Sequence, residues 1–414
     1  MVEVLLAKSI ANMIHSFSCK NFYSFGDKTT LDFSVNNNAP QNNGYFTAES
    51  GVRLSKVETV IGPNASGKTN ILKVLPFLKY LIIGSFNAKP ESLIPMQPFA
   101  FDGTKELPTE LSAVFEIDGK VYTYSFELTK QMILKEELKL TSFAKEKKST
   151  KKIFTRSWDK ETNQYKFEGD NFELPKGFEN LLRANASVIG TAARLNHTES
   201  KSIAKYWDQI ETNVDEAGWM GDNMFADATS RLIETFDFFS DNEALKKEAE
   251  KLLCRFDLGL SGFEIKKEKK ENGMSMNVRA AHLFNGEKQH LPVQYESSGT
   301  KQLFVLLKNI LVALERGSLV VVDEFDVNLH PEMVIALHDL FIQPETNPKN
   351  AQLLLSTHSH LLLSKLDKYQ IFLVEKNENG ASEGWRLDEM SDVRSDENYY
   401  SKYIAGAYGA VPKI

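Results

Sequence analysis

Apolar and polar residues alternate between positions 14 and 33, and aromatic residues are frequent among them. The same period of two returns in TELSAVFEIDGKVYTYSFELTK, from residue 109, and the short segment MILKEELKL follows it. Alternation of this kind predicts half-buried strands, and Asp118-Gly119 is typical of a tight turn between two of them. The first third of the chain is therefore predicted to form a small antiparallel sheet.

The apolar spacing changes to three and four between about residue 178 and residue 256, which predicts helices. Strands are expected to return at GFEIKKE and MSMNVRAAHLF. Beyond them, and also in the segment KVETVIG from Lys56, short apolar strands alternate with helices. The elements expected there are a helix over 67–81, a helix over 300–314, and strands over 319–322, 352–356 and 370–374, with a further helix over 331–341. Such alternation predicts an α/β fold with a parallel sheet covered on both faces.

The charge pattern leaves nucleic-acid binding open. A formal net charge of −7 argues against a protein that coats DNA, but a local basic groove remains compatible with it. Two lysine-rich segments, KEKKSTKK from Lys145 and KKEKK from Lys266, could contact DNA or an acidic protein. Solvated loop tips are the commoner explanation, and neither segment contains aromatic residues for base stacking.

Cysteine use and hydropathy bear on the compartment. Cys19 and Cys254 are the only cysteines and do not form a CxxC pair, which fits a reducing cytoplasm without a zinc or disulfide framework. The apolar segment from Val74 is too short for a membrane span and contains a lysine, so we expect no membrane association. Residues 1–12 precede the first well-formed element and are expected to be a leader or an alternative-start extension.

The segment GPNASGKT fits the phosphate-binding pattern G-x-x-x-x-G-K-[ST] at every position, between a predicted strand and a predicted helix. Its backbone amides and the lysine would hold the phosphates of ATP, and the threonine hydroxyl would bind Mg²⁺. A plain glycine turn before a helix is the alternative. The candidate nucleotide-binding residues are Gly62, Pro63, Asn64, Ala65, Ser66, Gly67, Lys68, Thr69 and Asn70.

Two later motifs place polar side chains after apolar strands. VVVDE carries Asp323, a candidate magnesium residue, and Glu324, which can polarise an attacking water. STHSH places His358 at the same sheet edge, where a histidine can contact the γ-phosphate; a helix-capping or core histidine is the alternative. His330 and His360 are expected to be structural.

In their order and spacing, GPNASGKT, SSG-x-x-Q, VVVDE and STH resemble the head of ABC-type ATPases. In that family the signature sequence closes over the γ-phosphate that a second subunit holds. The resemblance implies this role for Ser297, Ser298, Gly299 and Gln302, and it therefore implies a homodimer at least, with higher oligomers possible. The signature here is SSGTKQ in place of the usual LSGGQ.

The resemblance also implies a domain organisation and further residue roles. Residues 1–144 would form the first half of the ATPase head with its antiparallel β subdomain, 145–285 an insertion that is mainly helical from about 178 to 256, and 286–414 the second half. DVNLHP would be the loop that crosses between subunits, with Asp326 and Asn328 as its polar members. Gln97 is the candidate for the family's glutamine that couples magnesium to the inserted domain.

The insertion is too long for a transporter subunit and lacks the sustained heptads of a coiled-coil arm. The opening IHSFSCKNFYSF, the motif DEFDVNLHP and the ending YYSKYIAGAYGAVPKI resemble RecF-like and overcoming-lysogenization-defect-like ATPases, above all the AriA-type ATPase subunits of PARIS anti-phage systems. That implies an ATP-hydrolysing sensor or scaffold that holds a separate Toprim-type nuclease until a phage trigger protein appears. The alternative is a RecF-like DNA-binding ATPase of DNA repair.

Overall fold

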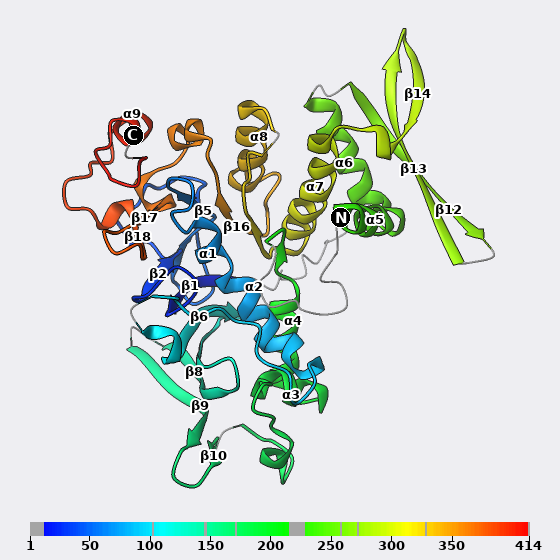
Figure 1. Cartoon of the computed structure of the whole chain (residues 1–414). Helices are drawn as coiled ribbons and strands as arrows, with labels where there is room; N and C mark the ends of the chain where they lie inside the picture. The colour runs from blue at the N-terminus through cyan, green and yellow to red at the C-terminus, as the bar shows by residue number, and fades with distance from the viewer. Residues whose placement is uncertain are drawn as a thin grey trace, which may run out of the picture.

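The computed structural model describes residues 12–101, 103–144, 147–169, 172–214, 228–256, 259–270, 273–327 and 329–412. Residues 1–11, for which a leader was expected, and Asn328 lie outside the described residues. Within them, two large sheets share the core of an α/β fold, as expected from the alternation of strands and helices (Figure 1).

The first sheet is antiparallel and contains seven strands in the order β10-β9-β8-β7-β6-β1-β2. The predicted turn between β6 and β7 is confirmed, because Asp118 and Gly119 both have positive φ, at 51° and 72°. The strands are β1 (Met13–Lys20), β2 (Thr29–Asp32), β6 (Thr109–Ile117), β7 (Lys120–Leu128), β8 (Ile133–Ala144), β9 (Lys147–Asp159) and β10 (Gln164–Glu168).

This sheet continues beyond residue 144, where the sequence indicated the start of an insertion. The expectation of a basic loop at KEKKSTKK is wrong for the described residues from Lys147 onward, since they form the start of β9 and pair with β8. A strand can keep its lysine side chains in solvent while its backbone pairs with a neighbouring strand. A run of lysines therefore does not exclude a strand. Likewise, KKEKK lies on β12 (Leu260–Lys270), paired to β13 (Gly273–Phe284).

The second sheet has the order β11-β15-β16-β5-β17-β18, and all its pairs are parallel except β17 with β18. Alternate residues of β15 belong to two separate apolar cores, with Leu319 and Val321 on one face and Val320 and Val322 on the other. The predicted parallel sheet with two covered faces is therefore confirmed. Its strands are β5 (Val57–Ile61), β11 (Glu211–Thr212), β15 (Leu319–Val322), β16 (Gln352–Ser356), β17 (Ile371–Lys376) and β18 (Ser382–Arg386).

Helices cover both faces of the parallel sheet and also pack beside it. They are α1 (Lys68–Leu72), α2 (Val74–Lys79), α3 (Val188–Arg194), α4 (Thr198–Asp208), α5 (Ala228–Asp241), α6 (Glu243–Arg255), α7 (Ser298–Arg316), α8 (Pro331–Ile342) and α9 (Tyr399–Ile404). One helical stretch among the described residues, Lys68–Asn87, is apolar and long enough to cross a membrane by composition and length alone, and 72% of its most apolar window is buried inside the protein.

Two smaller sheets complete the described chain. β3 (Tyr45–Thr47) pairs with β4 (Arg53–Ser55), while β12, β13 and β14 (Glu287–Pro292) form a sheet that extends away from α5 and α6 (Figure 1). Phe263 of β12 contacts Phe236 of α5 and Phe304 of α7, so an aromatic cluster joins this sheet to the helices. A 3-10 turn at Val293–Tyr295 links this sheet to α7, and residues of α7 line one cavity with Val322 at the end of β15.

Candidate active site

The phosphate-binding segment forms the predicted turn between β5 and α1. Two glycines are required there by geometry. A Cβ on Gly62 would lie 2.0 Å from the carbonyl oxygen of Val374 in β17, and Gly67 has a φ of 120°. Ala65 also takes a positive φ, of 61°. The turn is therefore pressed against the neighbouring strand and held in a conformation that L-residues rarely adopt.

Lys68 lies inside this turn. Its Nζ donates to the carbonyl oxygens of Gly62 and Pro63, at 2.8 and 2.9 Å. Burial lowers the pKa of the Lys68 ammonium, and the nearby carboxylates of Asp323 and Glu324 act in the opposite direction. The cation therefore faces the acidic end of β15 across the turn.

Ser24 and Ser382 support the turn from outside, and neither was singled out in the sequence. Asn70 donates to the Oγ of Ser24 at 2.8 Å, and the Oγ of Ser382 donates to the carbonyl oxygen of Ser66. The two serines also bond to each other, at 2.8 Å. Ser24 belongs to the aromatic segment near the N-terminus, so that segment helps to hold the phosphate-binding turn.

Asp323 and Glu324 follow the last residue of β15, as the apolar run predicted. One hydroxyl orients both of them: the Oγ of Ser356, at the end of β16, donates to Asp323 Oδ1 and accepts from the amide of Glu324 at 2.9 Å. Glu324 takes a φ of 51°, uncommon for a non-glycine residue. Its main chain turns away from the strand at this point, and the amide of Phe325 returns to the carbonyl oxygen of Ser356 at 2.9 Å.

Asp326 connects this turn to the histidine motif. Its Oδ1 accepts from Thr357 Oγ1 at 2.7 Å and from the amide of His358 at 2.9 Å. The His358 residue is exposed at the same sheet edge. The structure thus fixes the backbone of His358 against the acidic loop, and the proposed contact of its ring with a γ-phosphate stays a prediction.

The two histidines expected to be structural have structural contacts. The ring of His360 lies 5.1 Å from that of Tyr403 in α9, and burial, followed by the charge of His358, lowers the pKa of His360. His330 caps α8, where its Nδ1 accepts from the amide of Glu332 at 3.3 Å.

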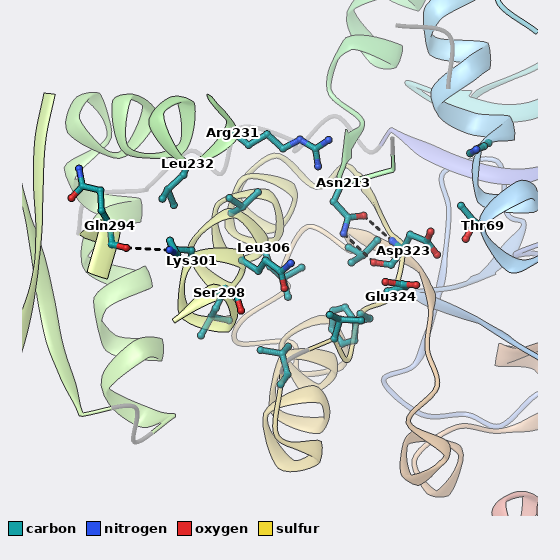
Figure 2. Close-up of a pocket in the computed structure, with 18 residues that line it drawn as sticks. Thr69, Asn213, Arg231, Leu232, Gln294, Ser298, Lys301, Leu306, Asp323 and Glu324 are labelled. Carbon is teal, nitrogen blue, oxygen red and sulfur yellow. Dashed lines mark hydrogen bonds between the residues drawn. The ribbon is translucent and has the colours of Figure 1, made fainter. Parts of the chain in front are cut away.

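A cavity of about 680 Å³ opens along this edge (Figure 2). Of the predicted site residues, it brings together Thr69, Asp323, Glu324, Ser298 and Gln302. Figure 2 shows Thr69 on one side of the two carboxylates and Ser298 of α7 on the other. The complete lining is Thr69, Lys73, Asn213, Arg231, Leu232, Gln294, Ser298, Lys301, Gln302, Leu303, Val305, Leu306, Val322, Asp323, Glu324, Phe325, Val327 and Leu329.

The signature segment forms the start of the 19-residue helix α7. The Oγ of Ser297 accepts from the amide of Thr300 at 3.1 Å, which makes Ser297 the N-cap. Ser297 and Ser298 are exposed, and Gly299 is half-buried. The positive end of the helix dipole is therefore accessible from outside the chain.

Gln97 is not among the residues that line the cavity. Its side-chain oxygen accepts from Lys130 Nζ at 3.2 Å, and its carbonyl oxygen accepts from the amide of Tyr23 at 2.7 Å. Asn213 occupies the position beside Asp323 instead, at the end of β11. Ser356 could have been found, since it begins the STHSH motif, whereas the two-residue strand before Asn213 has no periodicity to detect.

The residues present fit a magnesium-bound nucleoside triphosphate. The buried Oγ of Ser66 has no hydrogen-bond partner among the described residues, although it lies in the middle of the turn. The hydroxyl of Thr69 and the carboxylate of Asp323 line the same cavity, and oxygen atoms are the ligands that Mg²⁺ prefers. A phosphate in the turn would add hydrogen-bond acceptors where donors gather.

A family model agrees with this geometry. The family described as "AAA domain, putative AbiEii toxin, Type IV TA system" matches residues 59–364, which is well over half of the chain and includes every motif from the phosphate-binding turn to His358. The chain belongs to this family. It therefore carries an ATPase domain of the AAA type.

The individual relatives and solved structures share low sequence identity with this chain. The "Retron Ec83 probable ATPase" of Escherichia coli is 23% identical over 212 residues, a match that spans 45% of this chain and 38% of that protein. Among solved structures, the "SmcHead bound to the C-winged helix domain of ScpA" is 15% identical and has a TM-score of 0.47, with 92% of this chain and 99% of that chain covered. The "SMC head domain from Thermotoga maritima" is 14% identical with a TM-score of 0.40, covering 90% and 98%.

Proposed function

We propose that this protein is an ATP-hydrolysing sensor or scaffold subunit of a cytoplasmic anti-phage defence system. The observation that carries the proposal is the convergence of Lys68, Thr69, Asp323 and Glu324 at one edge of the parallel sheet. The AbiEii-type family supports the role in defence, and so does the similarity to a retron ATPase.

We assign each residue a role from the chemistry of its side chain, and its position supports that role. Lys68 and the amides of the turn bind the phosphates of ATP. Thr69 and Asp323 hold Mg²⁺, which neutralises charge on the phosphates. Glu324 holds and polarises the attacking water as general base. The exposed His358 contacts the γ-phosphate from the neighbouring strand end.

We further propose that two copies share each ATP site in the manner of ABC-type ATPases. The accessible N-terminus of α7 would supply Ser297, Ser298 and Gly299 to the triphosphate held by a second copy, where its amides and dipole stabilise negative charge. A homodimer is then the smallest active form.

The effector is proposed from sequence resemblance alone. In an AriA-type subunit of a PARIS system, the ATPase would hold a separate Toprim-type nuclease and release it when a phage trigger protein appears. A pulldown with the product of the neighbouring gene, together with plaque counts, tests this. Absence of a nuclease from the pulldown, or protection that persists in Lys68→Ala, would contradict it.

The enzymatic claim has a direct test. Lys68→Ala removes the cation that binds the phosphates, and Glu324→Gln removes the general base. We expect hydrolysis to fall about 100-fold or more in Glu324→Gln, since general-base catalysis contributes about 10² to 10⁴. Hydrolysis should be lost in Lys68→Ala because the phosphates are no longer bound. Glu324→Gln should still bind ATP, whereas Lys68→Ala should not; wild-type turnover in Glu324→Gln would refute the assignment.

The alternative function is a RecF-like DNA-binding ATPase, and the lysine-rich strands are its support. Several of these lysines are paired with carboxylates: Lys152 with Glu168 at 2.8 Å, and Lys267 with Asp237 at 2.8 Å. Such pairs reduce the charge available to a phosphate backbone. Retention of duplex DNA that weakens steeply with salt, and ATPase stimulated by DNA, would favour this alternative.

A further inference from the structure

The edge strand β11 ends beside the acidic end of β15. Glu211 and Thr212 pair in parallel with Val320 and Val321. The side chain of the next residue, Asn213, bonds twice to the main chain of Asp323: its Oδ1 accepts from the amide at 2.7 Å, and its Nδ2 donates to the carbonyl oxygen at 3.0 Å (Figure 2). One side chain therefore serves both polar groups of that residue's main chain.

The side chain of Asn213 takes over the hydrogen bonds of the Asp323 main chain at the point where the strand pairing ends. β15 stops at Val322, so the main chain of Asp323 has left the strand pairing. The Oγ of Ser356 orients the carboxylate of Asp323, while Asn213 fixes the orientation of its backbone. The position of the carboxylate depends on both, because a rotation of the backbone would move the side chain with it.

The other end of the same strand is bound to α7. Glu211 Oε2 lies 2.9 Å from Lys308 Nζ, and Glu211 Oε1 lies 3.3 Å from Arg316 Nη1. The Glu211 side chain is only 16% exposed, so solvent screens this pair of contacts incompletely. α7 is the helix whose first turn carries the signature serines.

We propose that Asn213 is a positioning residue for Asp323, and that Glu211 couples this position to the signature helix α7. The inference rests on the proposed function, since it takes Asp323 as the magnesium-side carboxylate. A triphosphate bound at the start of α7 and a magnesium ion bound at Asp323 are then linked through β11. The link consists of the contacts Lys308–Glu211 and Asn213–Asp323.

The first test measures magnesium dependence of nucleotide binding. Binding of a fluorescent ATP analogue is titrated with Mg²⁺ for wild type, for Asn213→Ala and for the control Ser364→Ala, whose hydroxyl bonds only to the carbonyl oxygen of Leu361 among its described contacts. The midpoint in Asn213→Ala should rise about 10-fold, the lower end of what loss of a partner behind a metal ligand costs. The affinity measured in EDTA should stay unchanged, because the phosphate-binding turn is intact.

That pattern separates positioning from general damage. An unchanged midpoint in Asn213→Ala overturns the inference, and so does an equal loss of affinity with and without Mg²⁺. A wild-type protein that binds no nucleotide would refute the proposed function itself, which is a different result. Unfolding curves for each variant establish that the protein is folded.

The second test addresses the coupling to α7 through Glu211, whose side chain contacts Lys308 and Arg316. Glu211→Gln should raise the Mg²⁺ midpoint less than Asn213→Ala, and the double variant should match Asn213→Ala alone, because contacts in one network are not additive. Glu315→Gln on α7 removes a charge without breaking the described pairs and should leave the midpoint unchanged. A full additive effect in the double variant would overturn the coupling.

Discussion

At the scale of single residues, the site depends on hydroxyl and amide groups that hold the charged residues in place. Ser356 orients both carboxylate residues at the end of β15, Asn213 fixes the backbone of one of them, and Asp326 joins their loop to His358. In the proposed mechanism, a misplaced carboxylate would keep its charge but would no longer meet the metal or the water. Precise placement therefore needs these neutral partners.

Ser356→Ala tests this dependence. The change removes the hydroxyl that contacts Asp323 and Glu324 while leaving the phosphate-binding turn intact. We expect ATP hydrolysis to fall about 10-fold and the affinity for nucleotide in EDTA to be retained. Ser364→Ala is the control, since that hydroxyl bonds only to the carbonyl oxygen of Leu361 among its described contacts. Full activity in Ser356→Ala would contradict the role.

At the scale of elements, a buried ion pair joins two strands of the antiparallel sheet to the start of α3. Arg156 of β9 and Glu136 of β8 are both fully buried, with 2.8 Å between Nη2 and Oε2. Glu136 also accepts from the amide of Val188 at the start of α3, at 2.7 Å. The pair thus connects two strands and a helix in the interior of the protein.

Arg156→Ala should therefore destabilise the protein by about 3–5 kcal/mol, because it leaves the Glu136 carboxylate buried and unpaired. Lys152→Ala on the same strand breaks an exposed pair with Glu168 and should cost less than about 1 kcal/mol. Urea unfolding of both variants provides the comparison. Equal effects would show that burial does not distinguish the two pairs.

The sequence predicted those elements whose signals are local. The phosphate-binding turn, the apolar run before Asp323 and the Asp118-Gly119 hairpin each follow from a few adjacent residues. β11 was missed because two residues have no period. β9 was missed because its pairing depends on the neighbouring strands β8 and β10 and not on its own lysines. Gln97 was predicted from the family resemblance alone. Asn213 could be identified only from the structure, which shows that β11 pairs with β15.

At the scale of the whole molecule, the edge of the parallel sheet carries the phosphate-binding turn and the two carboxylates, and the start of α7 is exposed. Thr69, which follows the phosphate-binding turn, and the two carboxylates line the same cavity as Ser298, and Figure 2 shows Thr69 and Ser298 on opposite sides of the carboxylates. In the proposed assembly, each helix start faces a neighbour's triphosphate. Nucleotide binding and assembly are then linked, and ATP should raise the population of the dimer or a larger oligomer.

The central claim is that ATP joins two copies through the start of α7. Native mass measurement of Glu324→Gln, with and without Mg²⁺ and ATP, tests it most directly when the same measurement is made on Glu324→Gln combined with Ser298→Arg. We predict that ATP shifts the first variant to a dimer or larger form, and that the added arginine blocks the shift while nucleotide binding persists. A mass that ATP leaves unchanged, or assembly that proceeds equally well with the arginine in place, would contradict the account.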